Sequence, residues 1–283
     1  MTEIAKIAVL GAGTMGRGIA HAAIAAGYAT SMYDVSDEAL AKGRAAIEHI
    51  AHTSVELGKL SRPDADAMLR RLSATGRLAE AVQDADFVIE AAPERIDLKL
   101  ALFAQIEDLA PPAAVIASNT SALSITEIAA SLRDPSRVAG MHFFNPVHKM
   151  KLIEIVQALQ TAPATLEAIA EVSRRMGKET VLVRESPGFI TTRVNASIGN
   201  EAFYMLMEGV ASARDIDKAL KLGLNHPMGP FELVDLVGLD TRLSILEYLH
   251  RSLGEKYRPC PLLAQYVKAG RLGRKVGRGV YEY

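Results

Sequence analysis

The sequence predicts an α/β fold of the Rossmann type, with a doubly wound, mostly parallel sheet followed by an all-α C-terminal domain. Short apolar runs alternate with longer helical patterns up to about residue 184, and a glycine-rich turn follows the first run. After Ser186-Pro187-Gly188 only helical periodicity continues. We therefore expect a dinucleotide-binding domain at 1–186 and a helical domain, for dimerisation or substrate binding, at 187–283.

The expected strands are rich in valine and isoleucine, and several lack polar alternation, which is typical of strands buried on both faces. They cover residues 7–10, 29–33, 86–90, 114–118, 138–143, 152–156 and 180–183. Helices are expected between them at 16–27, 98–109, 125–132 and 165–176, and in the second domain at 189–208, 213–222, 231–253 and 262–269.

Two further helices, at 36–58 and 63–72, form a predicted helical hairpin inserted into the sheet topology. Pro63 is suited to the first turn of the second helix. The hairpin carries six cations, namely Lys42, Arg44, Lys59, Arg62, Arg70 and Arg71. They favour a solvated helical face, and the alternative is a basic lid over an anionic substrate tail.

Composition narrows the class of protein. The 283 residues are 49% apolar, which fits two globular domains, and the net charge of -1 gives no nucleic-acid footprint. No apolar run approaches the roughly 20 residues that cross a bilayer. The single cysteine, Cys260, cannot form an internal disulfide, and no secretory signal pattern precedes the first strand. We expect a cytoplasmic protein with no metal, nucleic-acid or membrane partner.

The turn Gly11-Ala12-Gly13-Thr14-Met15-Gly16 lies between a strand and a helix, in the context of a dinucleotide-binding fingerprint. Gly11 permits the tight turn, Gly13 lets the backbone approach a pyrophosphate, and Gly16 lets helix and strand pack closely. Asp34 ends the next strand, where its carboxylate can accept hydrogen bonds from the adenosine ribose. Because that carboxylate would repel a 2′-phosphate, the cofactor is expected to be NAD.

Polar side chains follow or end three of the expected strands. Ser121 lies after the run at 114–117, His142 follows 138–141, and Glu154 follows Leu152-Ile153. Ligands of open parallel sheets bind beyond the carboxyl ends of strands, so these groups can converge. A histidine oriented by a carboxylate can take the proton of an alcohol that loses hydride. A serine hydroxyl can form a hydrogen bond with the oxygen of that alcohol. A buried histidine satisfied by backbone groups is the alternative for His142.

These residues resemble the L-3-hydroxyacyl-CoA dehydrogenase family in its short 3-hydroxybutyryl-CoA form. The resemblance covers the whole chain and rests on GAGTMG at 11–16, SNTS at 118–121, HFFNPV at 142–147, MKLIEI at 150–155, SPGFI at 186–190 and NHPMGPFELVDLVGLD at 225–240. It implies reversible, NAD-dependent oxidation of an L-3-hydroxyacyl-CoA to the 3-ketoacyl-CoA by a homodimer.

The resemblance also implies roles for single residues. His142 and Glu154 match the catalytic pair, and Ser121 and Asn145 match contacts to both substrate and cofactor. Further cofactor contacts fall on Glu94, Lys99 and Lys275, and Lys59 is a candidate for binding CoA. One position departs from the family: Thr192 stands where the family has asparagine, and Asn195 follows three residues later. A hydroxyl makes fewer hydrogen bonds than an amide, so we expect Thr192 to keep a weaker version of that catalytic-site role.

Two alternatives stay open beside this reading. One is a dehydrogenase of a free sugar acid or hydroxy acid on the same fold, since fold alone does not determine substrate. The other is a catalytically silent NAD-binding structural protein. The sequence also leaves acyl-chain length, physiological direction and pathway open, including fatty-acid β-oxidation, butyrate-type fermentation or polymer synthesis, and aromatic-acid degradation.

Overall fold

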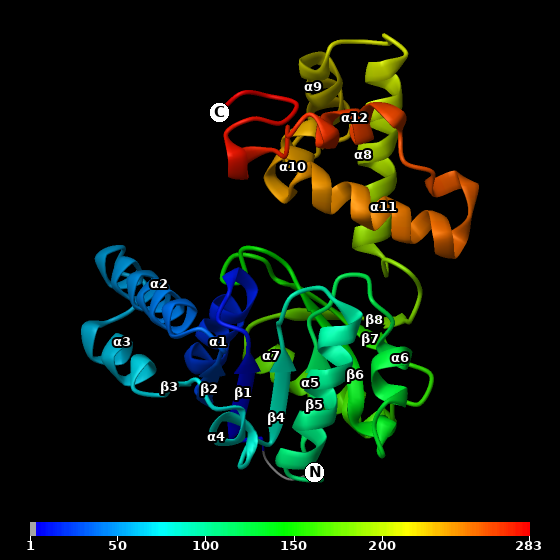
Figure 1. Ribbon diagram of the computed structural model, residues 1–283. Coiled ribbons are helices and arrows are strands. Elements are labelled where there is room, and N and C mark those ends of the chain that lie inside the picture. Colours follow the sequence, from blue (N-terminus) through cyan, green and yellow to red (C-terminus); the bar gives the residue numbers. More distant parts are fainter. Residues whose placement is uncertain (1–3) are drawn as a thin grey trace. The chain divides into compact units, whose positions relative to one another are not determined.

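The computed structural model describes residues 4–283 (Figure 1). The chain divides into two compact units, one ending at Glu185 and the other running from Ser186 to Tyr283. The expected boundary, after residue 186, lies one residue from this division.

The first unit is built on an eight-stranded sheet with the order β3-β2-β1-β4-β5-β6-β7-β8. Every neighbouring pair is parallel except β6 and β7, so the expected mostly parallel, doubly wound sheet is confirmed. The strands are β1 Lys6–Leu10, β2 Ala29–Tyr33, β3 Leu72–Thr75, β4 Phe87–Glu90, β5 Val115–Ser118, β6 Val138–Phe143, β7 Leu152–Gln157 and β8 Glu179–Arg184. The helices are α1 Thr14–Ala25, α2 Asp37–Glu56, α3 Arg62–Leu69, α4 Leu78–Val82, α5 Ile96–Leu109, α6 Ile125–Ala130, the 3₁₀ turn η1 Pro135–Arg137 and α7 Pro163–Arg175.

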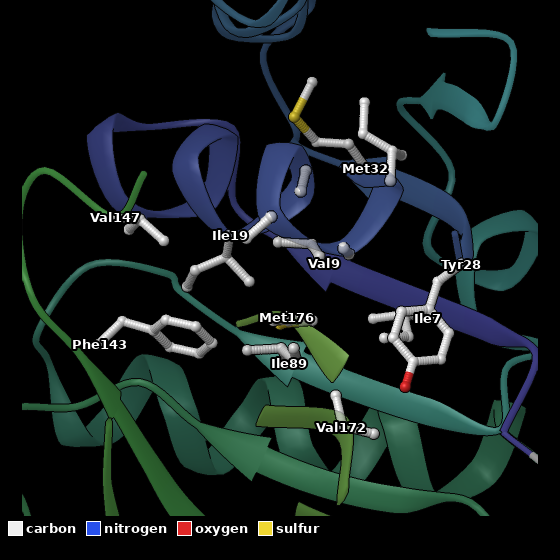
Figure 2. Packing of buried hydrophobic residues seen from close by; sticks show 14 of the residues in the cluster. Ile7, Val9, Ile19, Tyr28, Met32, Ile89, Phe143, Val147, Val172 and Met176 are labelled. Carbon is white, nitrogen blue, oxygen red and sulfur yellow. The ribbon is translucent and has the colours of Figure 1, made fainter. Parts of the chain in front are cut away.

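The central strands are continuous apolar runs because helices cover both faces of the sheet. Side chains of α1 and α7 share one core with the sheet, while α5 and α6 lie on the opposite face (Figure 1). Figure 2 shows Val9 of β1 and Ile19 of α1 packed together with Ile89 of β4. Burial on both faces removes the polar alternation that a half-exposed strand would show.

One strand and one helix of the first unit were not predicted. The segment assigned to the end of a helix at 63–72 instead leaves α3 at Leu69 and forms β3, which pairs with β2; α4 follows. Only Leu72 of β3 is buried, and Leu-Ser-Ala-Thr is too short to show a two-residue period. Its extended conformation therefore depends on pairing with β2 and not on the local sequence.

The hairpin of α2 and α3 presents an exposed, ion-paired surface. Lys42 pairs with Glu38, Arg44 with Glu48 and Arg62 with Asp66, each four residues apart on one helix and well exposed. Such pairs are typical of a solvated helical face.

The second unit is helical. It contains α8 Thr191–Met207, α9 Ala213–Gly223, α10 Pro230–Val237, α11 Leu239–Leu253, η2 Glu255–Tyr257, α12 Pro261–Lys268 and η3 Arg274–Val276. The single helix expected at 231–253 is wrong: Gly238, with φ of 105°, separates α10 from α11. A glycine adopts that backbone conformation without the steric strain that a side chain would bring. Among residues 4–283, no helix combines the length and apolar character that a bilayer crossing requires.

Two buried aspartates attach the C-terminal segment to these helices. Asp235 of α10 accepts hydrogen bonds from the backbone of Val280 and Tyr281 at 2.8 and 2.9 Å. Asp217 of α9 accepts one from the Tyr281 hydroxyl at 2.7 Å. Both carboxylates are at most 2% exposed, and their partners satisfy them. This anchoring gives the segment that carries Lys275 a defined course.

A histidine pair lies where the segment after β6 meets α1. The rings of His21 on α1 and His148 lie 6.4 Å apart, edge to face. Lys178 donates to the carbonyls of Val147 and Met150 in the same segment. Burial, followed by the charges of His148 and Lys178, lowers the pKa of His21 to about 4. Burial likewise lowers the pKa of His148. The folded protein therefore disfavours a proton on His21.

We predict that the protein loses stability as the pH falls from about 6.5 towards 4, with part of this loss due to His21. In that window the unfolded chain, with the ordinary histidine pKa, binds more protons than the folded one, so protonation favours unfolding. One such group contributes at most about 1.4 kcal/mol per pH unit. Thermal unfolding at pH 7 and pH 5 should show a smaller drop in Tm for His21→Gln than for the unmodified chain. Equal drops would contradict the prediction.

Candidate active site

The glycine-rich turn joins β1 to α1, and close contacts require each of its outer glycines. A Cβ on Gly11, where φ is 108°, would lie 2.6 Å from the carbonyl oxygen of Ala91. A Cβ on Gly16 would lie 1.7 Å from the carbonyl oxygen of Gly11. By contrast, a Cβ on Gly13 would meet nothing within 4 Å. The middle glycine thus borders open space at the N-terminus of α1, where a phosphate could approach the backbone.

A cavity of about 620 Å³ opens beside this turn. Gly11, Gly13, Thr14 and Met15 line it together with Asp34. Its opposite wall comes from the segment after β4 and from one side of α5, including Leu98, Leu102 and Gln105. The α5 wall was missed from the sequence, because an apolar stripe on a helix indicates core as readily as a binding surface. The size, the bare glycine and the helix N-terminus fit a dinucleotide.

Asp34 takes part in the turn itself. Its carboxylate accepts hydrogen bonds from the backbone N–H of Ala12 at 2.8 Å and of Ser36 at 3.0 Å. The carboxylate therefore fixes the glycine turn from inside the cavity. Ribose binding by Asp34 stays a prediction.

His142 and Glu154 lie directly opposite each other on β6 and β7. The imidazole Nδ1 and the carboxylate Oε2 are 2.7 Å apart, and both side chains are buried. The reasoning that placed Glu154 beyond the carboxyl end of a strand was wrong. Glu154 is the third residue of β7, and because β7 runs antiparallel to β6, its beginning lies beside the end of β6. The ring of Phe144 lies 4.5 Å from the imidazole.

The loop after β5 brings Ser121 to Glu94. The Glu94 Oε1 atom accepts hydrogen bonds from the Ser121 backbone N–H at 2.8 Å, from its hydroxyl at 3.1 Å and from the Thr120 hydroxyl at 2.6 Å. The sequence indicated Ser121 and Glu94 separately, and the structure joins them. Asn119, which the sequence reasoning missed, accepts a hydrogen bond from the backbone N–H of Phe143 at 2.9 Å and so ties this loop to the end of β6.

Lys99 projects from α5 into a fully buried ion pair. Its Nζ lies 2.5 Å from Glu90 Oε1 and 3.6 Å from Glu94 Oε2. Lys99 and Glu90 are 1% and 0% exposed. Glu90 was missed, since the last residue of a buried apolar run carries no signal of its own role. Cofactor contact by Glu94 and Lys99 stays a prediction.

The remaining predicted residues are distributed over the two units. Asn145 is exposed in the segment after β6, and Lys59 is exposed in the turn between α2 and α3. In the second unit, Thr192 lies in the first turn of α8. Lys275 lies in η3, where its Nζ is 2.6 and 2.7 Å from the two oxygens of Asp240. Their predicted contacts to substrate or cofactor stay predictions.

Comparison with known proteins gives one family for both units. Residues 6–186 match the NAD-binding domain of 3-hydroxyacyl-CoA dehydrogenases, and residues 188–283 match the C-terminal domain. A probable 3-hydroxybutyryl-CoA dehydrogenase of Bacillus subtilis is 48% identical over 99% of this chain and 98% of its own length. The crystal structure of an (S)-3-hydroxybutyryl-CoA dehydrogenase from Ralstonia eutropha matches with a TM-score of 0.95, at 42% identity over 99% of each chain.

A more distantly related enzyme of known structure is named for a different compound. It is an NAD+-dependent 5-formyl-3-hydroxy-2-methylpyridine 4-carboxylic acid 5-dehydrogenase, 31% identical, with a TM-score of 0.81 over 99% of this chain and 91% of the other. The family models nevertheless cover nearly all of the present chain, and the Bacillus subtilis relative is 48% identical to it. The chain belongs to the 3-hydroxyacyl-CoA dehydrogenase family.

Proposed function

We propose that this protein catalyses the reversible, NAD-dependent oxidation of a short L-3-hydroxyacyl-CoA, such as 3-hydroxybutyryl-CoA, to the 3-ketoacyl-CoA. The observation that carries the proposal is the buried His142–Glu154 pair, 2.7 Å between Nδ1 and Oε2, on the edge of a sheet that also holds the glycine-rich turn. The names of the relatives at 42–48% identity support the acyl-CoA substrate.

His142 acts as the general acid and base. Glu154, acceptor-only when ionised, holds the imidazole proton on Nδ1, which leaves the basic lone pair on Nε2. Nε2 takes the proton of the substrate 3-hydroxyl, and the Glu154 carboxylate stabilises the imidazolium that forms. When bound, NAD supplies the hydride acceptor. In the reverse direction His142 returns the proton to the ketone oxygen.

Ser121 and Asn145 orient the substrate in this proposal, with Ser121 hydrogen-bonded to the reacting oxygen. Glu94, Lys99 and Lys275 contact the cofactor. Lys59 contributes to the binding of CoA. Thr192, in the first turn of α8, provides a single hydroxyl in place of the family asparagine. A cytoplasmic location completes the proposal.

The substrate class can be tested with NADH and acetoacetyl-CoA. The protein should oxidise NADH in the presence of acetoacetyl-CoA, and His142→Gln should lower kcat on the order of 10²–10⁴-fold, because a positioned acid–base group is lost. NADH binding, measured by its fluorescence, should survive the substitution. Free acetoacetate serves as the control substrate: turnover of it at a rate equal to that of acetoacetyl-CoA would favour the free hydroxy acid alternative. Near-full turnover by His142→Gln would remove His142 from the acid–base role.

The role of Glu154 can be tested by removing its charge. Glu154→Gln keeps the shape of the side chain and removes the charge that stabilises the imidazolium, so kcat should fall by about 10²-fold or more while the KM for acetoacetyl-CoA changes little. The variant Glu107→Gln makes the same chemical change at a side chain that is 9% exposed and paired with Arg133 elsewhere in the first unit. If both variants lost turnover equally, the effect would not be specific to the His142 pair.

The second unit supports a homodimer. Ten large apolar side chains are exposed in residues 186–283 against eight in the nearly twice longer segment 4–185. Several cluster in sequence at the ends of α8 and α9, including Val210, Leu222 and Leu224, which are 64%, 76% and 65% exposed. Exposed apolar side chains that gather into one patch are typical of surfaces that associate. A second copy of the chain is the partner that we propose.

The oligomeric state tests this part of the proposal. Size-exclusion chromatography with light scattering should give about twice the 30.4 kDa mass of one chain. Leu222→Asp combined with Leu224→Asp should shift the protein towards the single-chain mass, because burying two carboxylates in an apolar interface is costly. Leu159→Asp, at a side chain that is 85% exposed in the first unit, is the matched control. A monomeric starting protein would contradict the proposal.

A further inference from the structure

Glu90, the last residue of β4, is a fully buried acid with three polar partners. Its Oε1 atom accepts hydrogen bonds from Lys99 Nζ at 2.5 Å and from the backbone N–H of Ala92 at 2.6 Å. Its Oε2 atom accepts one from the Ser118 hydroxyl at 2.6 Å. Removing a carboxylate from water is costly unless it is paired and hydrogen-bonded, so such a group needs a compensating arrangement around it. Here that arrangement reaches both sides of the candidate site.

On one side, Glu90 holds the wall behind the glycine-rich turn. The Ala91-Ala92 segment that its carboxylate fixes is the segment against which Gly11 packs, with only 2.6 Å between the Ala91 oxygen and an added Gly11 Cβ. The backbone N–H of Ala91 also donates to the carbonyl of Leu10 at 2.7 Å. A shift of this segment would therefore move one side of the cavity that fits the dinucleotide.

On the other side, Glu90 is the nearer of the two carboxylates that Lys99 pairs with. The Lys99 ammonium lies 2.5 Å from Glu90 and 3.6 Å from Glu94. Pairing with Glu90 leaves Glu94 Oε1 to accept from Thr120 and from the hydroxyl and backbone of Ser121. Without the Glu90 charge, the buried ammonium would have Glu94 as its nearest anion. Attraction between this buried ammonium and Glu94 would then compete with the hydrogen bonds that hold Ser121.

We propose that Glu90 is a positioning residue for the reaction: by binding Lys99, it keeps Glu94 on Ser121 and so sets the serine that binds the reacting oxygen. The inference rests on the proposed function for the role of Ser121. Glu90 acts through Lys99 and Glu94 and does not itself contact the substrate. Because the links are ionic and directional, the effect is carried by charge and is distinct from packing.

A double-mutant cycle tests the proposal. Glu90→Gln retains the size of the side chain and removes its charge, and we expect kcat with acetoacetyl-CoA at saturating NADH to fall by about tenfold or more, since small misplacements of orienting groups are costly. In the Glu94→Gln background, the same substitution should lower kcat by less than about twofold, because the route through Glu94 is already gone. Glu107→Gln, with the same chemical change in the first unit, should leave kcat unchanged.

Additive effects of Glu90→Gln and Glu94→Gln would overturn the proposal, because a merely structural role would lower kcat equally in both backgrounds. If Glu90→Gln alone folds poorly, as judged from its Tm, the variant with Lys99→Met added removes both buried charges. Its kcat at saturating NADH should exceed that of Glu94→Gln by about threefold or more, even though Lys99 is itself a proposed cofactor contact, since no ammonium then competes for Glu94. A kcat as low as that of Glu94→Gln would contradict the mechanism.

The two proposals fail in different ways. An unmodified protein that does not oxidise NADH with acetoacetyl-CoA contradicts the proposed function. The same cycle is then measured through the Kd for NADH, since Glu90 also sets the positions of Lys99 and, through it, of Glu94, which are both proposed cofactor contacts. Non-additive changes in that Kd would uphold the positioning role of Glu90, and additive changes would overturn it.

Discussion

The pairing of His142 with Glu154 depends on one reversal of strand direction. In a fully parallel sheet, the beginning of one strand and the end of its neighbour lie at opposite edges. Because β7 is antiparallel to β6, the third residue of β7 lies across from the fifth residue of β6, and the imidazole meets the carboxylate at 2.7 Å. The remaining sheet is parallel, so the glycine-rich turn and the loop after β5 reach the same edge. The antiparallel strand β7 thus places an acid–base pair at the same edge of the sheet as the glycine-rich turn.

Polar side chains, of which Glu90 is fully buried, link the parts of this edge. Asn119 ties the loop after β5 to the end of β6, Glu94 ties it to the segment before α5, and Glu90 ties that region to the wall behind Gly11. Each link is a hydrogen bond, and those of Asn119 and Glu94 join residues 24 and 27 positions apart in the sequence. Since such groups are costly when left unpaired, the network favours one arrangement of the loops over others. Hydride transfer from a carbon and proton transfer from its hydroxyl require such rigid placement of the loops.

The sequence predicts the features that depend on local sequence patterns. The central strands, the helical hairpin and the glycine-rich turn follow from apolar period, capping and glycine spacing, and the structure has them close to the expected bounds. The strand β3 and the break at Gly238 were missed, since one depends on pairing with β2 and the other on a single backbone angle. His142, Glu154 and Ser121 were indicated by position and by family motifs. Glu90 was not, because the sequence does not show that Lys99 and Ser118, 9 and 28 residues away, meet its carboxylate in the fold.

The measurement that tests the account most directly is the tautomer of His142 in the folded protein. Nitrogen NMR of protein labelled with ¹⁵N in its histidines reports which ring nitrogen carries the proton, and the His142→Gln variant identifies the signals. The account predicts that neutral His142 carries its proton on Nδ1, donated to Glu154, with Nε2 unprotonated. It also predicts that this preference weakens in Glu154→Gln. A proton on Nε2 in the unmodified protein would contradict the account, because the base would then point at its own carboxylate rather than at a substrate.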